Sequence, residues 1–173
     1  AEITLEANPD DIKQKMAKDW LSIGINRLSL GIQSFDEDEL KWMNRAHSAK
    51  HAKECIDIIQ DAGFENFSVD LIFGGPLQNN ETLENNINYI ASKNIAHVSA
   101  YALTVEEKTP LHHYIKTKKS PSVNSEKQAA QFLLTMKLLA DAGYEQYEIS
   151  NYAKNGMRSR HNSSYWQGKP YYG

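Results

Sequence analysis

A repeated unit constrains this fold more than any other feature: an amphipathic helix ends at a glycine or asparagine, and a β-rich strand follows within a few residues. Helices are predicted over residues 10–23, 48–62, 81–93 and 125–142. The strands that follow them are RLSLGIQ, FSVDLIF, HVSAYALT and QYEIS, and the strand ITLEA precedes the first helix. Helices and strands that alternate over short connections form right-handed crossovers and a parallel sheet. We therefore expect an α/β fold.

The two faces of the predicted strands differ, and the difference selects among parallel architectures. The first three strands turn one apolar face toward the helices, formed by Ile3, Leu5, Ala7, Leu28, Leu30, Ile32, Phe67, Val69, Leu71 and Phe73. Their other face is mostly small or polar. A doubly wound sheet would bury both faces, and a closed eight-stranded barrel would fill its interior with branched apolar residues. The pattern favours a partial TIM-like barrel over a doubly wound sheet, with helices on its outer face and a polar lumen.

Composition excludes several classes of partner. The formal net charge of -3, from 19 basic and 22 acidic residues, offers no basic surface for nucleic acid or an acidic membrane. No apolar run approaches the roughly 20 residues that span a bilayer, and the first residues show no targeting pattern, so we expect a cytoplasmic protein. Cys55 is the single cysteine, and alone it cannot form an internal disulfide or hold a zinc ion or cluster. Its place on an apolar helix stripe predicts core packing.

Three polar side chains recur on the inward face of consecutive strands: Glu6, Gln33 and Asp70. A buried carboxylate costs several kcal/mol unless it is paired or hydrogen-bonded. Two carboxylates beside a glutamine therefore indicate either a ligand rich in hydroxyl and amino groups or an internal hydrogen-bond network. Arg45, just beyond the second strand, can supply the counter-charge in either case.

Six strings of residues occur in one order that resembles a known group of proteins: EANP, GINRLSLGIQSF, MNRAH, DLIFGGP, SAYALT and QYEIS. They resemble the HemW and anaerobic coproporphyrinogen dehydrogenase families of radical S-adenosylmethionine proteins, and the match covers nearly the whole chain. The resemblance implies strands three to six of a six-stranded partial barrel. Residues 1–150 are then an incomplete radical S-adenosylmethionine core, and residues 151–173 begin the segment that follows it in HemW-type proteins.

The resemblance also implies roles for individual residues in binding S-adenosylmethionine. Glu6 would contact the amino group of the ligand, and Arg45 its carboxylate. Gln33 and Asp70 would contact the ribose hydroxyls. Carboxylate to ammonium and guanidinium to carboxylate are charge-assisted pairs, so these roles are chemically consistent. Thr104, at the end of the fourth strand, would lie beside the cofactor, or it could serve only to cap the strand.

The cluster-binding part of these families is not found in the chain. The families carry a CxxxCxxC motif that holds a four-iron, four-sulfur cluster, and a GGGTP-like segment, and both are expected to precede residue 1. Without three thiolates there is no cluster to deliver the electron that cleaves S-adenosylmethionine. We therefore expect the 4Fe-4S ligands to lie outside this chain and the chain alone to be catalytically inactive.

The tail sequence HNSSYW discriminates between the two related families. His161, Asn162, Tyr165 and Trp166 match the HNxxYW signature of HemW-type haem chaperones, which the true dehydrogenases do not share. The resemblance implies binding of haem, with His161 as an iron ligand, and transfer to a haem-accepting protein. The alternative is that the aromatic residues merely anchor the tail. His112 and His113 are weaker candidates, because adjacent helical residues face different sides.

Three functions remain open at this level. The first is part of a haem chaperone that binds haem and S-adenosylmethionine. The second is a radical enzyme that oxidatively decarboxylates coproporphyrinogen III, against which HNSSYW argues. The third is a binding module without catalysis, in which the inward polar residues satisfy one another. The strand ITLEA is expected to form an unpaired sheet edge, which predicts a homodimer or aggregation through that edge.

Overall fold

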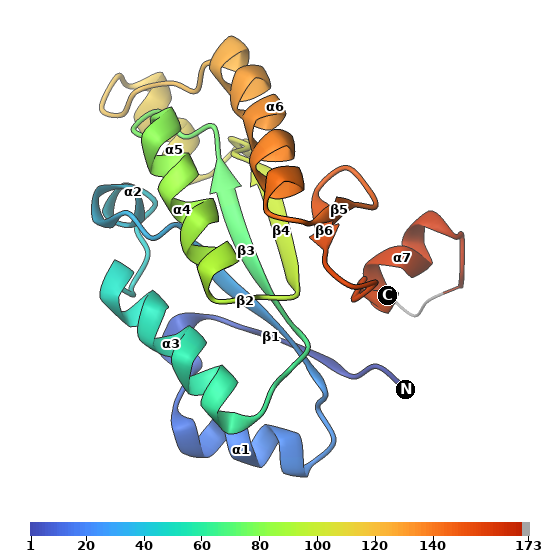
Figure 1. Ribbon diagram of the computed structural model, residues 1–173. Helices are drawn as coiled ribbons and strands as arrows, with labels where there is room; N and C mark the ends of the chain where they lie inside the picture. The colour runs from blue at the N-terminus through green and yellow to red at the C-terminus, as the bar shows by residue number, and fades with distance from the viewer. Residues whose placement is uncertain (171–173) are drawn as a thin grey trace.

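The computed structural model describes residues 1–170 and shows one sheet with most of its helices on a single side (Figure 1). In chain order the elements are β1 (Thr4–Ala7), η1 (Pro9–Asp11), α1 (Gln14–Ser22), β2 (Arg27–Gln33), α2 (Glu37–Trp42), α3 (Ala49–Ala62), β3 (Phe67–Phe73), α4 (Asn80–Ser92), β4 (His97–Ala102), α5 (Pro110–Lys116), α6 (Ser125–Asp141), β5 (Glu145–Gln146), β6 (Asn151–Ala153) and α7 (Arg160–Trp166).

The strands form a six-stranded sheet in the order β1-β2-β3-β4-β6-β5. β1 to β4 are parallel neighbours, joined by the helices of the repeated unit. α1 packs against α3, and α4 packs against α6, so these four helices cover the outer face (Figure 1). The predicted α/β fold with a partial-barrel sheet is confirmed.

The predicted apolar face forms the core. Leu28, Leu30 and Ile32 of β2 are fully buried, and the corresponding residues of β3 are at most 2% exposed. Ile3 departs from the pattern, because it precedes β1 at the sheet edge and is 50% exposed. Cys55 is fully buried in the core, and its thiol donates to the Pro9 carbonyl at 3.3 Å. Core packing of this cysteine is therefore confirmed.

Side-chain caps explain why the predicted helices begin where they do. The side chains of Ser48, Asn79 and Asn124 accept hydrogen bonds from backbone amides in the first turns of α3, α4 and α6. α3 ends at Gly63, whose φ of 100° lies in the left-handed region that favours glycine. These three helices match the predicted ranges within about one residue.

The predicted helix over residues 10–23 is wrong at its start. The chain first makes the short η1 helix after Pro9 and adopts an extended conformation at Ile12 and Lys13 before α1 begins. Ile12 is buried outside any α-helix, whereas Met16 and Ile23 are substantially exposed. The apparent apolar stripe therefore spans two elements with different directions. α2 was not predicted.

The predicted strand QYEIS is also replaced by a different structure. Residues 147–150 form a tight turn, in which the Tyr147 amide donates to the Asn151 carbonyl at 3.1 Å. The turn is closed further by the Ser150 amide, which donates to the Glu148 carboxylate at 2.9 Å. The chain consequently reverses, and β6 pairs antiparallel with both β4 and β5. The sheet thus continues past residue 150, and the predicted division at that residue stays a prediction.

Within the described range, no helix is both long enough and apolar enough to cross a membrane.

Candidate functional site

Two pockets lie on the inner face of the sheet. One, of about 250 Å³, lies over the middle of the strands and is lined by Thr4, Glu6, Arg27, Ser29, Asp70, Ser99, Tyr101, Ser159, His161 and Asn162. The other, of about 720 Å³, lies at the carboxyl ends of the strands and includes Gln33, Trp42, Arg45, Leu103 and Tyr114. We call them the middle pocket and the end pocket.

The middle pocket brings Glu6 and Asp70 together, as their shared inward face predicts, whereas Gln33 and Arg45 line the end pocket. Gln33 is the last residue of β2, four residues beyond Ser29, and this position places it at the carboxyl end of the strand. The pairing of β2 with β3 shifts register between Leu30 and Gln33, and Gln33 has a φ of 70°, which is uncommon for a residue other than glycine.

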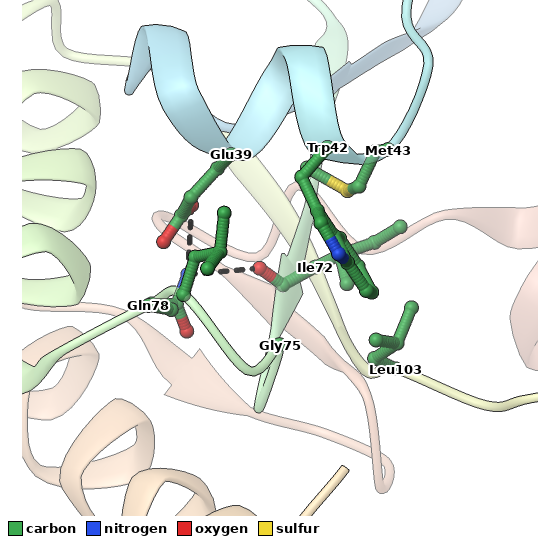
Figure 2. A pocket seen from close by; sticks show the side chains of 8 residues that line it. Glu39, Trp42, Met43, Ile72, Gly75, Gln78 and Leu103 are labelled. Atoms are coloured by element: carbon green, nitrogen blue, oxygen red, sulfur yellow. Dashed lines mark hydrogen bonds between the residues drawn. The ribbon is translucent and has the colours of Figure 1, made fainter. Parts of the chain in front are cut away.

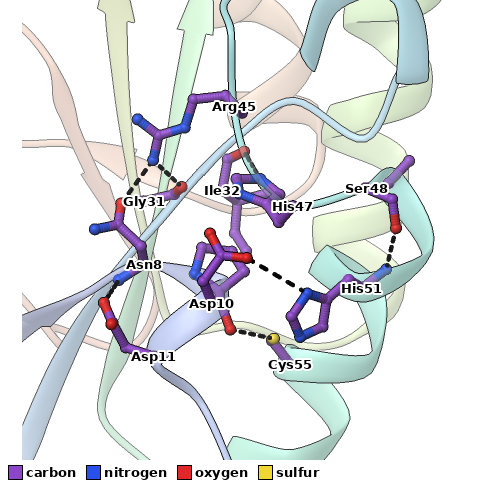
Figure 3. Close-up of polar contacts among 12 residues, drawn as sticks. Asn8, Asp10, Asp11, Gly31, Ile32, Arg45, His47, Ser48, His51 and Cys55 are labelled. Atoms are coloured by element: carbon purple, nitrogen blue, oxygen red, sulfur yellow. Dashed lines mark hydrogen bonds and ion pairs between the residues drawn. The ribbon is translucent and has the colours of Figure 1, made fainter. Parts of the chain in front are cut away.

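Arg45 is fixed at the floor of the end pocket by the bulged strand (Figure 3). Its Nη2 atom donates to Asn8 Oδ1 at 2.6 Å and to the Gly31 carbonyl at 3.2 Å. A Cβ atom at Gly31 would lie 3.1 Å from both Asn8 Oδ1 and Gln33 Nε2, so glycine permits this close approach. Asn8 was not predicted as a site residue, although it follows Glu6 on the inward face of the first strand and could have been identified by that position.

A buried polar cluster holds α2 beside the small pocket drawn in Figure 2. Trp42 and Met43 line both this small pocket and the end pocket. The Glu39 carboxylate accepts from Ser34 Oγ at 2.5 Å and from Gln78 Nε2 at 3.1 Å. Burial raises the pKa of Glu39, and the two hydrogen bonds oppose that rise. Because Glu39 lies one turn before Trp42 and Met43, this cluster sets the positions of both side chains. It anchors α2 to β2 and to the loop after β3.

The Asp70 carboxylate in the middle pocket is held by several serine hydroxyls. Ser29 Oγ lies 3.1 Å from each of its carboxylate oxygens, and Ser68 Oγ donates to Oδ1 at 3.3 Å. Burial raises the pKa of Asp70, while bonds from Ser99, Ser29 and Ser68 and the nearby charge of Arg27 lower it. The serines occupy the inward positions of neighbouring strands, which is the signal by which sequence could have identified them.

Arg27 supplies positive charge beneath this pocket. It is 3% exposed, and its Nε and Nη2 atoms have no hydrogen-bond partner within residues 1–170. Burial lowers the pKa of Arg27, and the neighbouring charge of Glu2 opposes this shift most strongly. The Arg27 guanidinium partly offsets the negative charges of Glu6 and Asp70. The pocket therefore offers hydrogen-bond acceptors with a smaller net negative charge than two carboxylates alone would give.

Helix α7 carries the HNSSYW motif to the mouth of the middle pocket. Ser159 caps the helix by accepting from the Asn162 amide at 3.2 Å, and Glu2 accepts from the Arg160 and His161 amides at 3.0 and 3.1 Å. His161 and Asn162 line the pocket, whereas Tyr165 and Trp166 are 49% and 64% exposed. His161 Nε2 lies 3.2 Å from the Tyr165 hydroxyl, and the two rings meet edge to face.

The remaining candidates lie away from both pockets. Thr104 is exposed, and its hydroxyl donates to the Ala102 carbonyl at 3.4 Å, an arrangement that closes the end of β4. Its neighbour Leu103 lines the end pocket instead. His112 and His113 lie on α5, and neither lines the two pockets.

The residues suit S-adenosylmethionine better than an iron-sulfur cluster. Carboxylates in the middle pocket and a guanidinium in the end pocket match the ribose, ammonium and carboxylate of that ligand. No group of three or more His, Cys, Asp or Glu residues in the described part of the chain is arranged to hold a metal ion. The Cys55 thiol is buried, and burial raises its pKa to about 12, so it does not fit cluster ligation.

Comparison with known proteins gives consistent relationships. The heme chaperone HemW of Bacillus subtilis is 38% identical over 173 residues, which cover 100% of this chain and 46% of that protein. Radical S-adenosyl methionine domain-containing protein 1, mitochondrial, of Danio rerio is 33% identical over 100% of this chain and 39% of its own length. The chain thus spans less than half the length of these relatives.

Comparison with solved structures shows that the fold of this chain is shared with a known enzyme. The solved structure of the coproporphyrinogen III oxidase HemN from Escherichia coli, a radical SAM enzyme by its description, superposes with a TM-score of 0.78. The alignment covers 97% of this chain and 38% of that one at 22% sequence identity. A model of the Radical SAM superfamily matches residues 1–90, more than half of the chain. The chain therefore belongs to the radical SAM superfamily, and within it the sequence is similar to the HemW chaperones and the fold to HemN.

Proposed function

We propose that this chain is the middle part of a cytoplasmic haem chaperone that binds S-adenosylmethionine in its sheet lumen and haem beside α7, and that passes haem to an acceptor protein. The observation that carries the proposal is the placement of His161 and Asn162 at the mouth of the pocket that contains Glu6 and Asp70. Similarity to HemW over the whole chain supports it. The 4Fe-4S cluster would be held by residues outside this chain.

The proposed S-adenosylmethionine site uses both pockets. In the end pocket, Arg45 would bind the carboxylate of the ligand, because Nη2 is already anchored and the rest of the guanidinium faces the pocket. In the middle pocket, Asp70 would accept from the ribose hydroxyls and Glu6 from the ammonium group. Gln33, which lines the end pocket, would contact the ribose from that side. Thr104 would at most border the adenine.

The proposed haem site is formed by α7. A histidine at the exposed end of a pocket, beside a tyrosine and a tryptophan, offers a nitrogen ligand and flat apolar surfaces. Iron binding through His161 Nε2 would require the Tyr165 hydroxyl to give up its contact with that atom. We therefore expect Tyr165 to move when haem binds.

Ligand titrations of the full-length protein test the nucleoside part. Asp70→Asn and Arg45→Gln should each lower the affinity for S-adenosylmethionine by about 10-fold or more, because a hydrogen bond to a charged group contributes roughly 1.5–3 kcal/mol. Lys137→Gln, a surface cation paired with Asp141, is the control and should change nothing. Adenosine, which lacks the amino-acid end, should be sensitive to Asp70→Asn and insensitive to Arg45→Gln. Equal sensitivity of adenosine to both would refute the two-pocket assignment.

Haem titration tests the chaperone part and separates it from the enzyme alternative. His161→Ala should weaken haem binding, measured by the Soret absorbance, whereas His113→Ala on α5 should not. Turnover of coproporphyrinogen III by the cluster-loaded full-length protein would favour the radical decarboxylase instead. Wild-type protein that binds neither haem nor S-adenosylmethionine would leave the non-catalytic binding module as the function.

A further inference from the structure

A continuous series of hydrogen bonds connects the cap of α7 to the carboxylate of Asp70. The Ser159 amide donates to the Tyr147 hydroxyl at 3.2 Å, and that hydroxyl lies 2.7 Å from His97 Nε2. On the other side of the imidazole, Nδ1 lies 2.8 Å from Ser68 Oγ, which is 3.3 Å from Asp70 Oδ1. Ser159, His97 and Ser68 are fully buried, whereas Tyr147 and Asp70 are partly buried.

One direction of donation gives every proton of this series an acceptor within the protein. The Ser99 hydroxyl, 3.1 Å from Ser68 Oγ, can then donate to Ser68 without changing that direction. An ionised Asp70 carboxylate can only accept, so the Ser68 hydroxyl donates to it and must accept from His97 Nδ1–H. His97 Nε2 is then the acceptor for the Tyr147 hydroxyl, whose oxygen accepts from the Ser159 amide. With the proton on Nε2 instead, Tyr147 would have no acceptor among its contacts within residues 1–170, and Ser68 could not donate to Asp70.

His97 remains neutral in this arrangement. Its ring is fully buried in the sheet, and burial, helped by the charge of Arg27, lowers the pKa of His97 to about 3. The tyrosine is held as a donor for the same reason, because burial raises the pKa of Tyr147 to about 12. Neither group therefore gains or loses a proton near neutral pH, and the direction of the hydrogen bonds is preserved.

We propose that Ser68, His97 and Tyr147 are positioning residues that orient the Asp70 carboxylate for a ribose diol and couple it to the helix carrying the HNSSYW motif. We call these three residues the relay. The ribose ligand rests on the proposed function, whereas the direction of the relay does not. Binding that shifts Asp70 would be transmitted through the relay to Ser159, the first anchor of α7.

The tautomer of His97 tests the relay without any ligand. Two-dimensional ¹⁵N spectra of the histidine rings, assigned with His97→Gln, should show wild-type His97 as neutral with its proton on Nδ1. Ser68→Ala removes the acceptor of that proton and should shift the ring toward the Nε2–H form. A wild-type ring protonated on Nε2, or a Ser68→Ala ring that does not change, would overturn the relay.

Tyr147→Phe tests the coupling in the cluster-loaded full-length protein. The loss of one hydrogen bond should weaken S-adenosylmethionine binding by about 2- to 10-fold. The matched control is Tyr144→Phe, whose buried hydroxyl donates to the Ile95 carbonyl at 2.6 Å outside the relay, and it should bind as the wild type does. In wild-type protein the ligand should also slow hydrogen exchange of the Ser159 amide, and Tyr147→Phe should abolish that effect.

The outcomes separate the two proposals. If Tyr147→Phe binds the ligand as tightly as wild type and Ser159 still responds to it, the coupling is refuted while nucleoside binding stands. If wild-type protein binds no S-adenosylmethionine, the proposed function fails, and the His97 tautomer alone decides the relay.

Discussion

Replacing Gly31 with alanine probes whether the Arg45 cluster forms one end of the ligand site. The new Cβ atom would lie 3.1 Å from Asn8 Oδ1, 3.1 Å from Gln33 Nε2 and 3.5 Å from Arg45 Nη2. All three atoms belong to side chains, and the backbone of Gly31 is not in the left-handed region. The strand can therefore keep its conformation, while the side chains at the end pocket must move by a few tenths of an ångström.

The expected magnitude follows from the contact that is disturbed. The bond from Arg45 Nη2 to Asn8 Oδ1 is 2.6 Å long, and a hydrogen bond to a charged group is worth roughly 1.5–3 kcal/mol. Losing about half of that energy corresponds to about 0.8–1.5 kcal/mol, or about 3- to 12-fold in S-adenosylmethionine affinity. The free energy of unfolding should change less. Replacing glycine with alanine lowers the conformational entropy of the unfolded chain, which stabilises the protein by about 0.4–1 kcal/mol and offsets the crowding.

Calorimetric titration of Gly31→Ala and wild-type full-length protein provides the assay, with thermal denaturation as a check of folding. Gly75→Ala is the matched control, because a Cβ atom there meets nothing within 4 Å. The control should bind S-adenosylmethionine with wild-type affinity. A folded Gly31→Ala protein with unchanged affinity would show that the cluster at Gly31 takes no part in binding.

Three further predictions concern the core and the sheet edge. Burial raises the pKa of Glu39, so the native state favours the protonated carboxyl. The contribution of this protonation to the free energy of unfolding is therefore largest below pH 4.5 and is lost as pH rises through the raised pKa. Urea unfolding at several pH values should show that Glu39→Gln removes this pH dependence. The buried Cys55 thiol, with its pKa raised to about 12, should resist alkylation by iodoacetamide at pH 8 until the protein is unfolded; rapid native labelling, followed by mass spectrometry, would contradict the packing. β1 is an edge strand, so this chain should dimerise or aggregate through it, and Ile3→Lys at the exposed edge should reduce the association; light scattering from a clean monomer at all concentrations would count against this.

Signals from neighbouring residues in the sequence were sufficient to predict most of the helices on the outer face of the sheet. Ser48 and Gly63 mark the two ends of α3 because capping and left-handed geometry depend on neighbouring residues only. The alternation along β2 and β3 likewise predicted which face is buried, since strand periodicity is local. The exception is Ile12, whose burial depends on the direction of the chain after η1, a property that hydrophobic spacing does not encode.

The site was predictable in its composition and less so in its arrangement. The alternation of side chains along the strands predicted that Glu6 and Asp70 share one face, and the structure brings them into one pocket. The bulge at Gln33 depends on how β2 registers with β3, which the alternation of residues in β2 does not reveal. His97 and Tyr147 could not be paired from sequence, because the tight turn that aims Tyr147 at β4 breaks the predicted strand.

The separation of the two pockets restricts the kind of ligand that the lumen can hold. Arg45 is held at Gly31 and Asp70 is held at Ser29, and these two residues lie two apart on β2, roughly 7 Å at about 3.3 Å per residue. A small anion could reach Arg45, and a simple sugar could reach Asp70, but neither would contact both. A ligand that uses both ends must be elongated, with a carboxylate at one end and hydroxyl groups farther along. Because Arg45 and Asp70 are each held by their own contacts, such a ligand meets two preformed ends and needs little rearrangement of either. The spacing of these two held groups along β2 is therefore the feature that makes the polar sheet face selective for the length of its ligand.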